Sequence, residues 1–187
     1  MDDLYLFYHK IDMILEIRTM RSADWEKYRD FRLQALRDEP DLFNGSFEIE
    51  KDLPENYWKG TIREADKMEK FWLLFAWEND VPIGMISAFK GTDEKLGHIV
   101  TVSCPYVSVK DGGKGVERKL ISDIENDILK NEGVRKIRCF ITVNQPEKIA
   151  MFQQAGFKIV GELSEEMRLA TGGYINEYIL EKSLIRA

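Results

Sequence analysis

A glycine-rich segment at residues 112–115 has the residue types that bind a phosphate group. Three glycines fall within four residues, around Lys114, after an apolar strand-like run and before a helical pattern. The first turn of a helix has backbone N–H groups without partners, and the helix dipole favours an anion there. The sequence therefore predicts a phosphate or pyrophosphate site at this loop. Glu117, in the first helical turn, adds a carboxylate beside the expected anion.

An amphipathic helix is predicted directly after the glycines. Its apolar residues recur at helical spacing, and they are Val116, Leu120, Ile121, Ile124 and Ile128. Two common phosphate motifs do not fit the loop. The lysine lacks the following Ser or Thr of a Walker loop. Glu117 and Arg118 stand where a dinucleotide fingerprint would have its third glycine.

Composition restricts the class of protein. The chain has 187 residues, of which 44% are hydrophobic and 32% charged, as expected for one soluble globular domain. Its net charge is −6 and its basic residues are dispersed, which argues against nucleic acid and favours a cationic or amine partner. We expect no membrane partner and a cytoplasmic location, because no apolar stretch has the length of a membrane span and no signal peptide is evident. Cys104 and Cys139 lack metal-binding spacing, so we expect reduced core thiols and no metal.

The order of predicted elements indicates one α+β domain at residues 14–185, with residues 1–13 as a leader of uncertain status. Strands are expected at 14–18, 71–78, 83–91, 98–109, 135–143, 157–163 and 174–184. Helices are expected from an N-cap at Ser22 to Pro40, from near Asp52, over 116–129, and from a capping box formed by Asn144 and Glu147 to Gly156. The aromatic segment 43–51 is expected to be an irregular loop that could line a site.

This order, together with its motifs, resembles the GNAT superfamily of acyl-CoA-dependent N-acetyltransferases over nearly all of residues 14–185. The matching positions are Tyr106 and Val107, then Gly113 to Val116 in the loop, then Gln154 to Phe157, and finally Gly173, Tyr174, Asn176, Glu177 and Leu184. The run 33–43, followed by acidic residues and Trp58, is similar to the substrate-side helices of several members.

The resemblance implies a mixed, mostly antiparallel sheet of about seven strands, with strands four and five splayed apart and about four flanking helices. It implies acetyl-CoA as co-substrate and direct transfer of the acetyl group to a primary amine of a small molecule or polypeptide. The pantetheine arm of acetyl-CoA would pair with the backbone of residues 106–108, and the pyrophosphate of acetyl-CoA would lie on the N–H groups of residues 112–117. The N–H near Val107 would stabilise the oxyanion that forms when the amine attacks the thioester. The cofactor-binding residues implied are Tyr106, Val107, Ser108, Gly112, Gly113, Lys114, Gly115, Val116, Arg118 and Asn144.

Several positions depart from the family pattern. Gly112 and Glu117 replace the usual Arg or Gln and the usual Gly or Ala of the loop, and Phe152 replaces a tyrosine thought to protonate the leaving thiolate. Lys148 replaces a small residue, and the spacing from Asn144 to Phe152 is one residue longer than common. An acyl-CoA-binding or interaction protein with little or no catalysis is therefore the alternative function. A module that forms a homodimer through the closing strands is a third.

The sequence does not identify the general base or acid. His98, at the start of the fourth expected strand, could act through water, or could be an ordinary strand-end residue. Glu48 and Glu50 could bind a cationic amine, or could form a solvated face. The aromatic residues Phe43, Tyr57 and Trp58 could line an acceptor pocket, although core packing is the simpler interpretation.

Overall fold

The computed structural model describes residues 15–184 of the chain, so the expected leader at 1–13 and the start of the first strand lie outside the described residues. Within them the chain forms eight strands and five α-helices, as an α+β fold. The strands are β1 (Glu16–Arg18), β2 (Phe71–Glu78), β3 (Val81–Lys90), β4 (Ile99–Val102), β5 (Tyr106–Val107), β6 (Lys136–Thr142), β7 (Lys158–Arg168) and β8 (Tyr174–Ser183). The helices are α1 (Trp25–Asp38), α2 (Phe47–Glu50), α3 (Glu55–Asp66), α4 (Val116–Leu129) and α5 (Pro146–Gln154).

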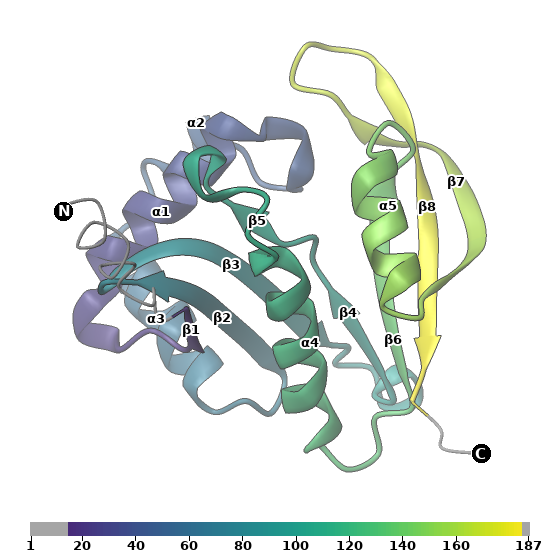
Figure 1. Cartoon of the computed structure of the whole chain (residues 1–187), viewed down its shortest axis with the longest axis horizontal. Coiled ribbons are helices and arrows are strands. Elements are labelled where there is room, and N and C mark those ends of the chain that lie inside the picture. Colours follow the sequence, from purple (N-terminus) through teal and green to yellow (C-terminus); the bar gives the residue numbers. More distant parts are fainter. Residues whose placement is uncertain (1–14, 185–187) are drawn as a thin grey trace, which may run out of the picture.

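Helices cover both faces of a single mixed sheet (Figure 1). The strand order is β1-β2-β3-β4-β6-β8-β7, with β5 paired to β3 off this path. Alternate residues of β2 explain why its sequence is a continuous apolar run: Trp72, Leu74 and Ala76 pack with α4, while Leu73, Phe75 and Trp77 pack with α1 and α3. The predicted apolar stripe of α4 is fully buried in the first of these two cores.

The two strands expected to splay do so. β4 pairs with β6 in parallel over residues 99–101 and 136–138, which is the only parallel pairing among the described strands. Farther along, the two chains diverge, and Figure 1 shows β4 and β6 close at one end and well separated at the other.

The prediction of one continuous strand over 98–109 was wrong. The chain leaves β4 after Val102, and Ser103 bonds to Ser87 through both its backbone N–H and its hydroxyl. It then re-enters the sheet as β5, which pairs with Gly84 and Met85 of β3. Residues 109–111 form a short 3₁₀ turn. A run of β-favouring residues does not reveal such a change of partner.

Helix ends differ from prediction in detail. α1 begins at Trp25 after a 3₁₀ turn that contains Ser22, and neither that turn nor α1 has a side-chain cap. α5 begins after Gln145 and shows no side-chain capping bond, so the capping box predicted from Asn144 was wrong. The segment expected to be an irregular loop contains the one-turn helix α2. α3 begins at Glu55, with Pro54 as its N-cap.

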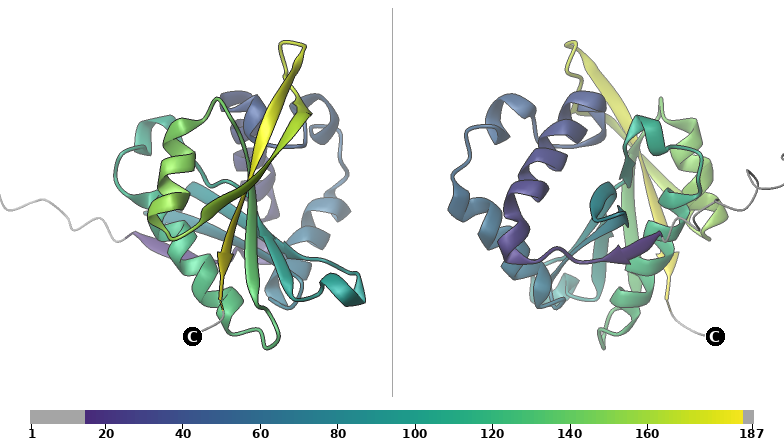
Figure 2. Two further views of the ribbon diagram at one scale, coloured as in Figure 1. Left: turned by 90° about the vertical axis from the view of Figure 1, so that its right-hand side faces the viewer. Right: turned by 60° about the vertical axis from the view of Figure 1, so that its left-hand side comes forward.

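Two hairpins join consecutive strands of the sheet. Asn79 and Asp80 join β2 to β3 with φ values of 49° and 61°, as a two-residue hairpin turn requires. The β7–β8 hairpin extends beyond the body of the sheet (Figure 2). No helix in the described part of the chain combines the length and apolar character needed to cross a bilayer.

Candidate active site

The free edge of β5 faces the gap between the splayed strands. The Ser108 N–H donates to the Ile83 carbonyl at 2.9 Å, and the register places Val107 opposite Gly84. Hydrogen-bonded and non-bonded pairs alternate along an antiparallel ladder, so the backbone groups of Tyr106 and Ser108 face β3, while those of Val107 face away from it. The carbonyl of Pro105 lies on the same free edge as the Val107 N–H. An extended ligand could therefore pair with this edge.

The side chain of Tyr106 lies on the other side of the sheet. It is fully buried against Phe31 and Phe43, and its hydroxyl donates to Asp38 at 2.5 Å. Burial and the neighbouring Asp38 carboxylate raise the pKa of Tyr106 well above its ordinary value, so the phenol stays protonated. The ring of Tyr106 therefore belongs to the core on the α1 and α3 side of the sheet, and only its backbone position in β5 brings the residue to the gap.

The glycine loop leaves the N-terminus of α4 open. Gly113 and Gly115 have φ values of 77° and 76°, where side chains are strained, and a Cβ at either position would meet no atom within 4 Å. Gly115 is the N-cap of α4, and no side chain caps the helix. The N–H groups of the first turn are consequently open to an external acceptor. This is the geometry of an anion site at the end of the β5–α4 connection.

Lys114 does not point into this open space. Its Nζ bonds Asp111 at 3.0 Å and Glu78 at 3.3 Å. Asp111 is buried and also accepts the Ser108 hydroxyl. Burial acts to raise the pKa of Asp111, but the hydrogen bonds from Ser108 and Lys114 outweigh it and hold this pKa below its ordinary value. Lys114 thus fixes the loop, and the backbone N–H groups are the donors left for a ligand.

Glu117 pairs with Lys148, a residue of α5. The Lys148 Nζ lies 3.4 Å from Glu117 and 3.4 Å from Glu39, and it donates to the Pro105 carbonyl at 3.1 Å. The Lys148 side chain is 14% exposed. Two of the positions that depart from the family pattern therefore contact each other, and the charge of Glu117 is offset by a lysine from the neighbouring helix.

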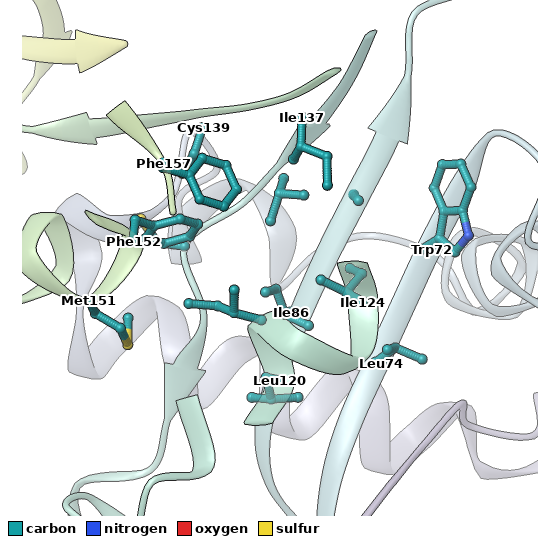
Figure 3. Close-up of a cluster of buried hydrophobic side chains, with 14 of the residues drawn as sticks. Trp72, Leu74, Ile86, Leu120, Ile124, Ile137, Cys139, Met151, Phe152 and Phe157 are labelled. Carbon is teal, nitrogen blue, oxygen red and sulfur yellow. The ribbon is translucent and has the colours of Figure 1, made fainter. Parts of the chain in front are cut away.

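Phe152 is a core residue. Its ring is fully buried and makes an edge contact with Phe157 at 5.0 Å between centroids (Figure 3). A phenylalanine ring has no group that can donate a proton, so Phe152 cannot protonate a leaving thiolate.

A pair of cavities lies beside α1 and α2, on the face of the sheet opposite to α4 and α5. Two adjoining cavities of about 160 and 310 Å³ share part of their lining. The residues common to both are Arg32, Phe43, Ser87, Ser103 and Cys104. Since Ser103 and Cys104 directly precede the free edge of β5, these cavities approach the gap from the side away from α4 and α5.

An ion pair lies beside these cavities: Arg32 lines both of them, and Glu50 lines the smaller one. Arg32 donates two hydrogen bonds to Glu50, at 2.9 and 2.6 Å, and the side chains are 17% and 12% exposed. The guanidinium also stacks on the Phe43 ring, 4.3 Å from its centroid. Glu50 is therefore neutralised and held in place, which makes it a poor general base.

Glu177 is the carboxylate that lines the larger cavity. It lies on β8, is 9% exposed, and pairs across the ladder with Thr142 of β6. Burial raises the pKa of Glu177, and the nearby Glu166 raises it further. A buried carboxylate with a raised pKa, facing a cavity, has the properties of a general base.

Comparison with known proteins identifies the fold and the family. A family model described as Acetyltransferase (GNAT) family matches residues 32–157. The chain belongs to this GNAT family. A search of curated proteins gave no match.

Solved structures of similar fold include several GNAT proteins. A GNAT family acetyltransferase from Streptococcus pneumoniae superposes with a TM-score of 0.82 at 16% identity, covering 91% of this chain and 99% of that one. The structure of yncA from Salmonella typhimurium with its cofactor acetyl-CoA gives 0.77 at 17% identity, over 92% and 95% of the two chains. A ribosomal-protein-alanine N-acetyltransferase from Brucella melitensis gives 0.76 at 19%, over 91% and 100%. At these identities the likeness establishes the fold.

In this GNAT protein the structure brings together most residues predicted for a coenzyme site. Val107, the loop glycines and Val116 follow one another along the β5–α4 connection, where the side chains of Val107 and Val116 are buried in the core. Arg118 lines a cavity of about 350 Å³ between α4 and α5. Asn144 is exposed, while the next residue, Gln145, has a buried amide oxygen without a hydrogen-bond partner in the described chain. The assignment of these residues to a coenzyme stays a prediction.

The predicted catalytic candidates are widely separated. His98 is exposed at the closed end of the β4–β6 pair, where its carbonyl accepts bonds from Arg135 and Lys136. Glu48 is exposed and paired with Lys51. Only Glu50 reaches the cavity. Of the three aromatic candidates, Trp58 is fully buried in the core, whereas Phe43 and Tyr57 line the smaller cavity.

Sequence reasoning missed Glu177 as a candidate base and the contact between Lys148 and Glu117. A weak signal existed for Glu177, because it is an acidic residue inside an apolar strand and within a family motif. The contact of Lys148 joins residues 31 positions apart. No local pattern could have indicated it.

Proposed function

We propose that this protein is an acetyl-CoA-dependent N-acetyltransferase that transfers an acetyl group directly to a primary amine of a small molecule or polypeptide. The observation that carries the proposal is the free edge of β5, which ends in an uncapped, glycine-lined helix N-terminus. A pantetheine arm needs an unpaired strand edge, and the pyrophosphate attached to it needs backbone N–H donors. Both lie in one connection of ten residues or so.

The acceptor cavities support the second half of the proposal. They lie across the sheet from α4 and α5 and share Ser103 and Cys104, which lead into the free edge. An amine bound there would reach the thioester from the opposite side to the coenzyme. The uncompensated charge in the larger cavity is the Glu177 carboxylate, since Arg32 and Glu50 neutralise each other. A cationic amine therefore suits the cavity electrostatically.

Glu177 is our candidate for the general base. An amine must lose a proton before its nitrogen can attack, and a carboxylate with a raised pKa accepts that proton more readily than an exposed one. The proton passes from the ammonium group to Glu177, directly or through one water molecule. The largely buried site keeps the carboxylate from being screened by bulk solvent.

The transfer then needs only a few groups. The amine nitrogen forms a bond to the thioester carbonyl carbon, and the negative charge that develops on the oxygen is stabilised by the Val107 N–H. The carbon–sulfur bond breaks and its electron pair stays on sulfur, while the proton that the nitrogen loses as the amide forms passes through water to the thiolate. A thiolate is a tolerable leaving group near neutral pH, so transfer does not require a tyrosine at position 152.

A second candidate function is binding of an acyl-CoA without efficient catalysis. Phe152 favours it, because its ring is enclosed in the core and cannot donate a proton to the thiolate. The two candidates share the coenzyme site and differ in turnover.

Thermal unfolding with CoA and acetyl-CoA tests the shared part. A ligand at one hundred times its dissociation constant should stabilise the protein by about 2.7 kcal/mol. The same preparation is then assayed for release of free thiol from acetyl-CoA with a panel of amines, including polyamines, amino acids and lysine-containing peptides.

Stabilisation by CoA together with amine-dependent thiol release supports the transferase. Stabilisation without release above the rate in buffer favours the binding protein. If millimolar CoA does not change the unfolding temperature of the wild-type protein or of the Lys148→Met variant introduced below, both CoA-dependent functions are excluded.

A further inference from the structure

Lys148 occupies the edge of β5 that a coenzyme would use. Its Nζ donates to the Pro105 carbonyl at 3.1 Å, and this carbonyl faces the gap between β5 and β6. The lysine comes from the first half of α5, on the far side of the gap. Lys148 therefore bridges α5 and the edge of β5, across the gap where the two chain segments have diverged.

A chain that pairs with this edge needs two backbone groups. Along one edge of a strand, a paired segment donates to the carbonyl of one residue and accepts from the N–H two residues later. On β5 these groups are the Pro105 carbonyl and the Val107 N–H. The Lys148 ammonium takes the first of them, so an added strand and Lys148 compete for the same acceptor.

Two carboxylates offer the Lys148 ammonium alternative partners. Its Nζ lies 3.4 Å from both Glu117 and Glu39, whose side chains are 37% and 34% exposed. These distances are longer than those of charge-assisted hydrogen bonds, which are about 2.7–2.9 Å. The ammonium can exchange the Pro105 carbonyl for a closer contact with a carboxylate without becoming unpaired. Displacing the Lys148 ammonium from the Pro105 carbonyl therefore costs less free energy than displacing a buried charge that has no other partner.

We propose that Lys148 caps the free edge of β5 and competes with the pantetheine arm of acyl-CoA, and so sets the affinity of the protein for its coenzyme. This inference rests on the proposed function, because it takes the occupant of the gap to be an acyl-CoA. When the arm binds, the Lys148 ammonium moves to Glu117. There it neutralises a carboxylate that would otherwise repel the pyrophosphate.

Lys148 then has two opposite effects on coenzyme binding. It opposes binding of the pantetheine arm by covering the Pro105 carbonyl. It favours binding of the pyrophosphate by offsetting Glu117. The two effects are separable, because pantetheine contains the arm and its amides but has no phosphate group.

The test measures dissociation constants of pantetheine and CoA for the wild type and for Lys148→Met, by calorimetry and by thermal shift. Methionine keeps an aliphatic side chain but removes the ammonium group. We expect Lys148→Met to bind pantetheine about tenfold more tightly, since one charge-assisted hydrogen bond no longer competes. We expect a smaller gain for CoA, or none, because Glu117 is then left unneutralised.

Lys136→Met is the matched control. Lys136 lies on β6 at the closed end of the splay, and it pairs with Glu181 at 2.9 Å with a side chain 30% exposed. This change removes one partly buried, ion-paired lysine without touching the free edge. We expect no change in pantetheine binding. Unfolding curves of both variants check that the fold is kept.

Two other outcomes overturn the proposal in distinguishable ways. If the wild type binds CoA and Lys148→Met binds pantetheine equally or less tightly, Lys148 does not compete with the arm, and the proposed function stands without it. If neither protein binds CoA or pantetheine, the proposed function fails and the inference fails with it.

Discussion

Two buried cations near the free edge of β5 are held in different ways. Beside the α1–α2 cavities, Arg32 makes two hydrogen bonds to Glu50, at 2.9 and 2.6 Å, and stacks on Phe43. Lys148 shares its ammonium among one carbonyl and two carboxylates, with no distance shorter than 3.1 Å. After their proposed roles, we call the cavity side with Arg32, Glu50 and Glu177 the acceptor wall, and the side with Lys148, Glu117 and the glycine loop the coenzyme wall. The planar guanidinium is suited to a fixed bidentate geometry, and the flexible ammonium is suited to exchange between partners.

The carboxylates differ in the same sense. Glu50 is 12% exposed and would be left against an apolar and aromatic wall if Arg32 were removed. Glu39 and Glu117 are each about a third exposed, so water can replace the lysine. The acceptor wall is thus held in one arrangement without a ligand, whereas the contacts of Lys148 can be exchanged. On our proposal, the first wall would set the geometry of the substrate and the second the affinity for the coenzyme.

The largest expected effect tests whether the chemistry belongs to the acceptor wall. Glu177→Gln should lower kcat by about 10²–10⁴-fold, the usual contribution of a general base, and leave the dissociation constant of CoA unchanged. Steady-state kinetics and calorimetry measure the two quantities. An equal loss of CoA affinity would mean that Glu177 supports the fold of the groove rather than the proton transfer.

The pH profile gives a second readout for the same residue. The base works only when deprotonated, so the rate falls as pH drops through the Glu177 pKa. Because burial and Glu166 raise this pKa, the acid limb should lie above the ordinary range of a glutamate. Glu166→Gln, the matched control, removes only the neighbouring charge. It should move the acid limb to lower pH while keeping most of the activity.

The next prediction compares Arg32 and Lys148 through the free energy of unfolding. Glu50→Ala leaves the Arg32 guanidinium buried and unpaired and should lower the free energy of unfolding by about 3 kcal/mol. Lys148→Met leaves two solvated carboxylates and should cost less than about 1 kcal/mol. Urea unfolding measures both. Glu48→Ala is the control, because Glu48 lies on the same turn as Glu50 but its side chain is 76% exposed. Similar losses for Glu50→Ala and Lys148→Met would contradict the distinction between the walls.

The sequence predicts best those parts of each wall that depend on residues close together in the chain. Only the loop and helix of the coenzyme wall are local: glycines at 113 and 115 and apolar residues every four positions from Val116 predict them, and both are present. The contacts of Lys148 on the same wall join distant segments. The break in the strand at residues 103–105 is not predictable in this way. It depends on β5 pairing with β3 instead of continuing beside β6, which is a tertiary choice.

The acceptor wall is assembled almost entirely from distant segments. Arg32 and Glu50 come from α1 and α2, and Glu177 comes from the last strand. The sequence shows many carboxylates, but it does not show which of them becomes buried. Glu48 and Glu50 were equivalent candidates by pattern, and only packing against α1 distinguishes them. The family resemblance predicted the fold correctly, yet it assigned no base.

The smallest effect disturbs the acceptor wall without removing either charge. Gly45 packs against the ion pair so closely that a Cβ at this position would lie 2.0 Å from a Glu50 carboxylate oxygen and 2.9 Å from an Arg32 nitrogen. Gly45→Ala should therefore push the Glu50 side chain away from Arg32. We expect a loss of about 1 kcal/mol, at the low end of the range for overpacking in a core, because the atoms that must move are the ends of flexible side chains.

Gly60→Ala is the control for Gly45→Ala. Gly60 lies within α3, and a Cβ there would meet no atom within 4 Å, so alanine should raise stability by about 0.5–1 kcal/mol through helix propensity. A neutral result for Gly45→Ala would mean that the Glu50 side chain can relax within the cavity. The Arg32–Glu50 pair would then be adaptable, as the Lys148 contacts are, and preorganisation would no longer separate the two walls.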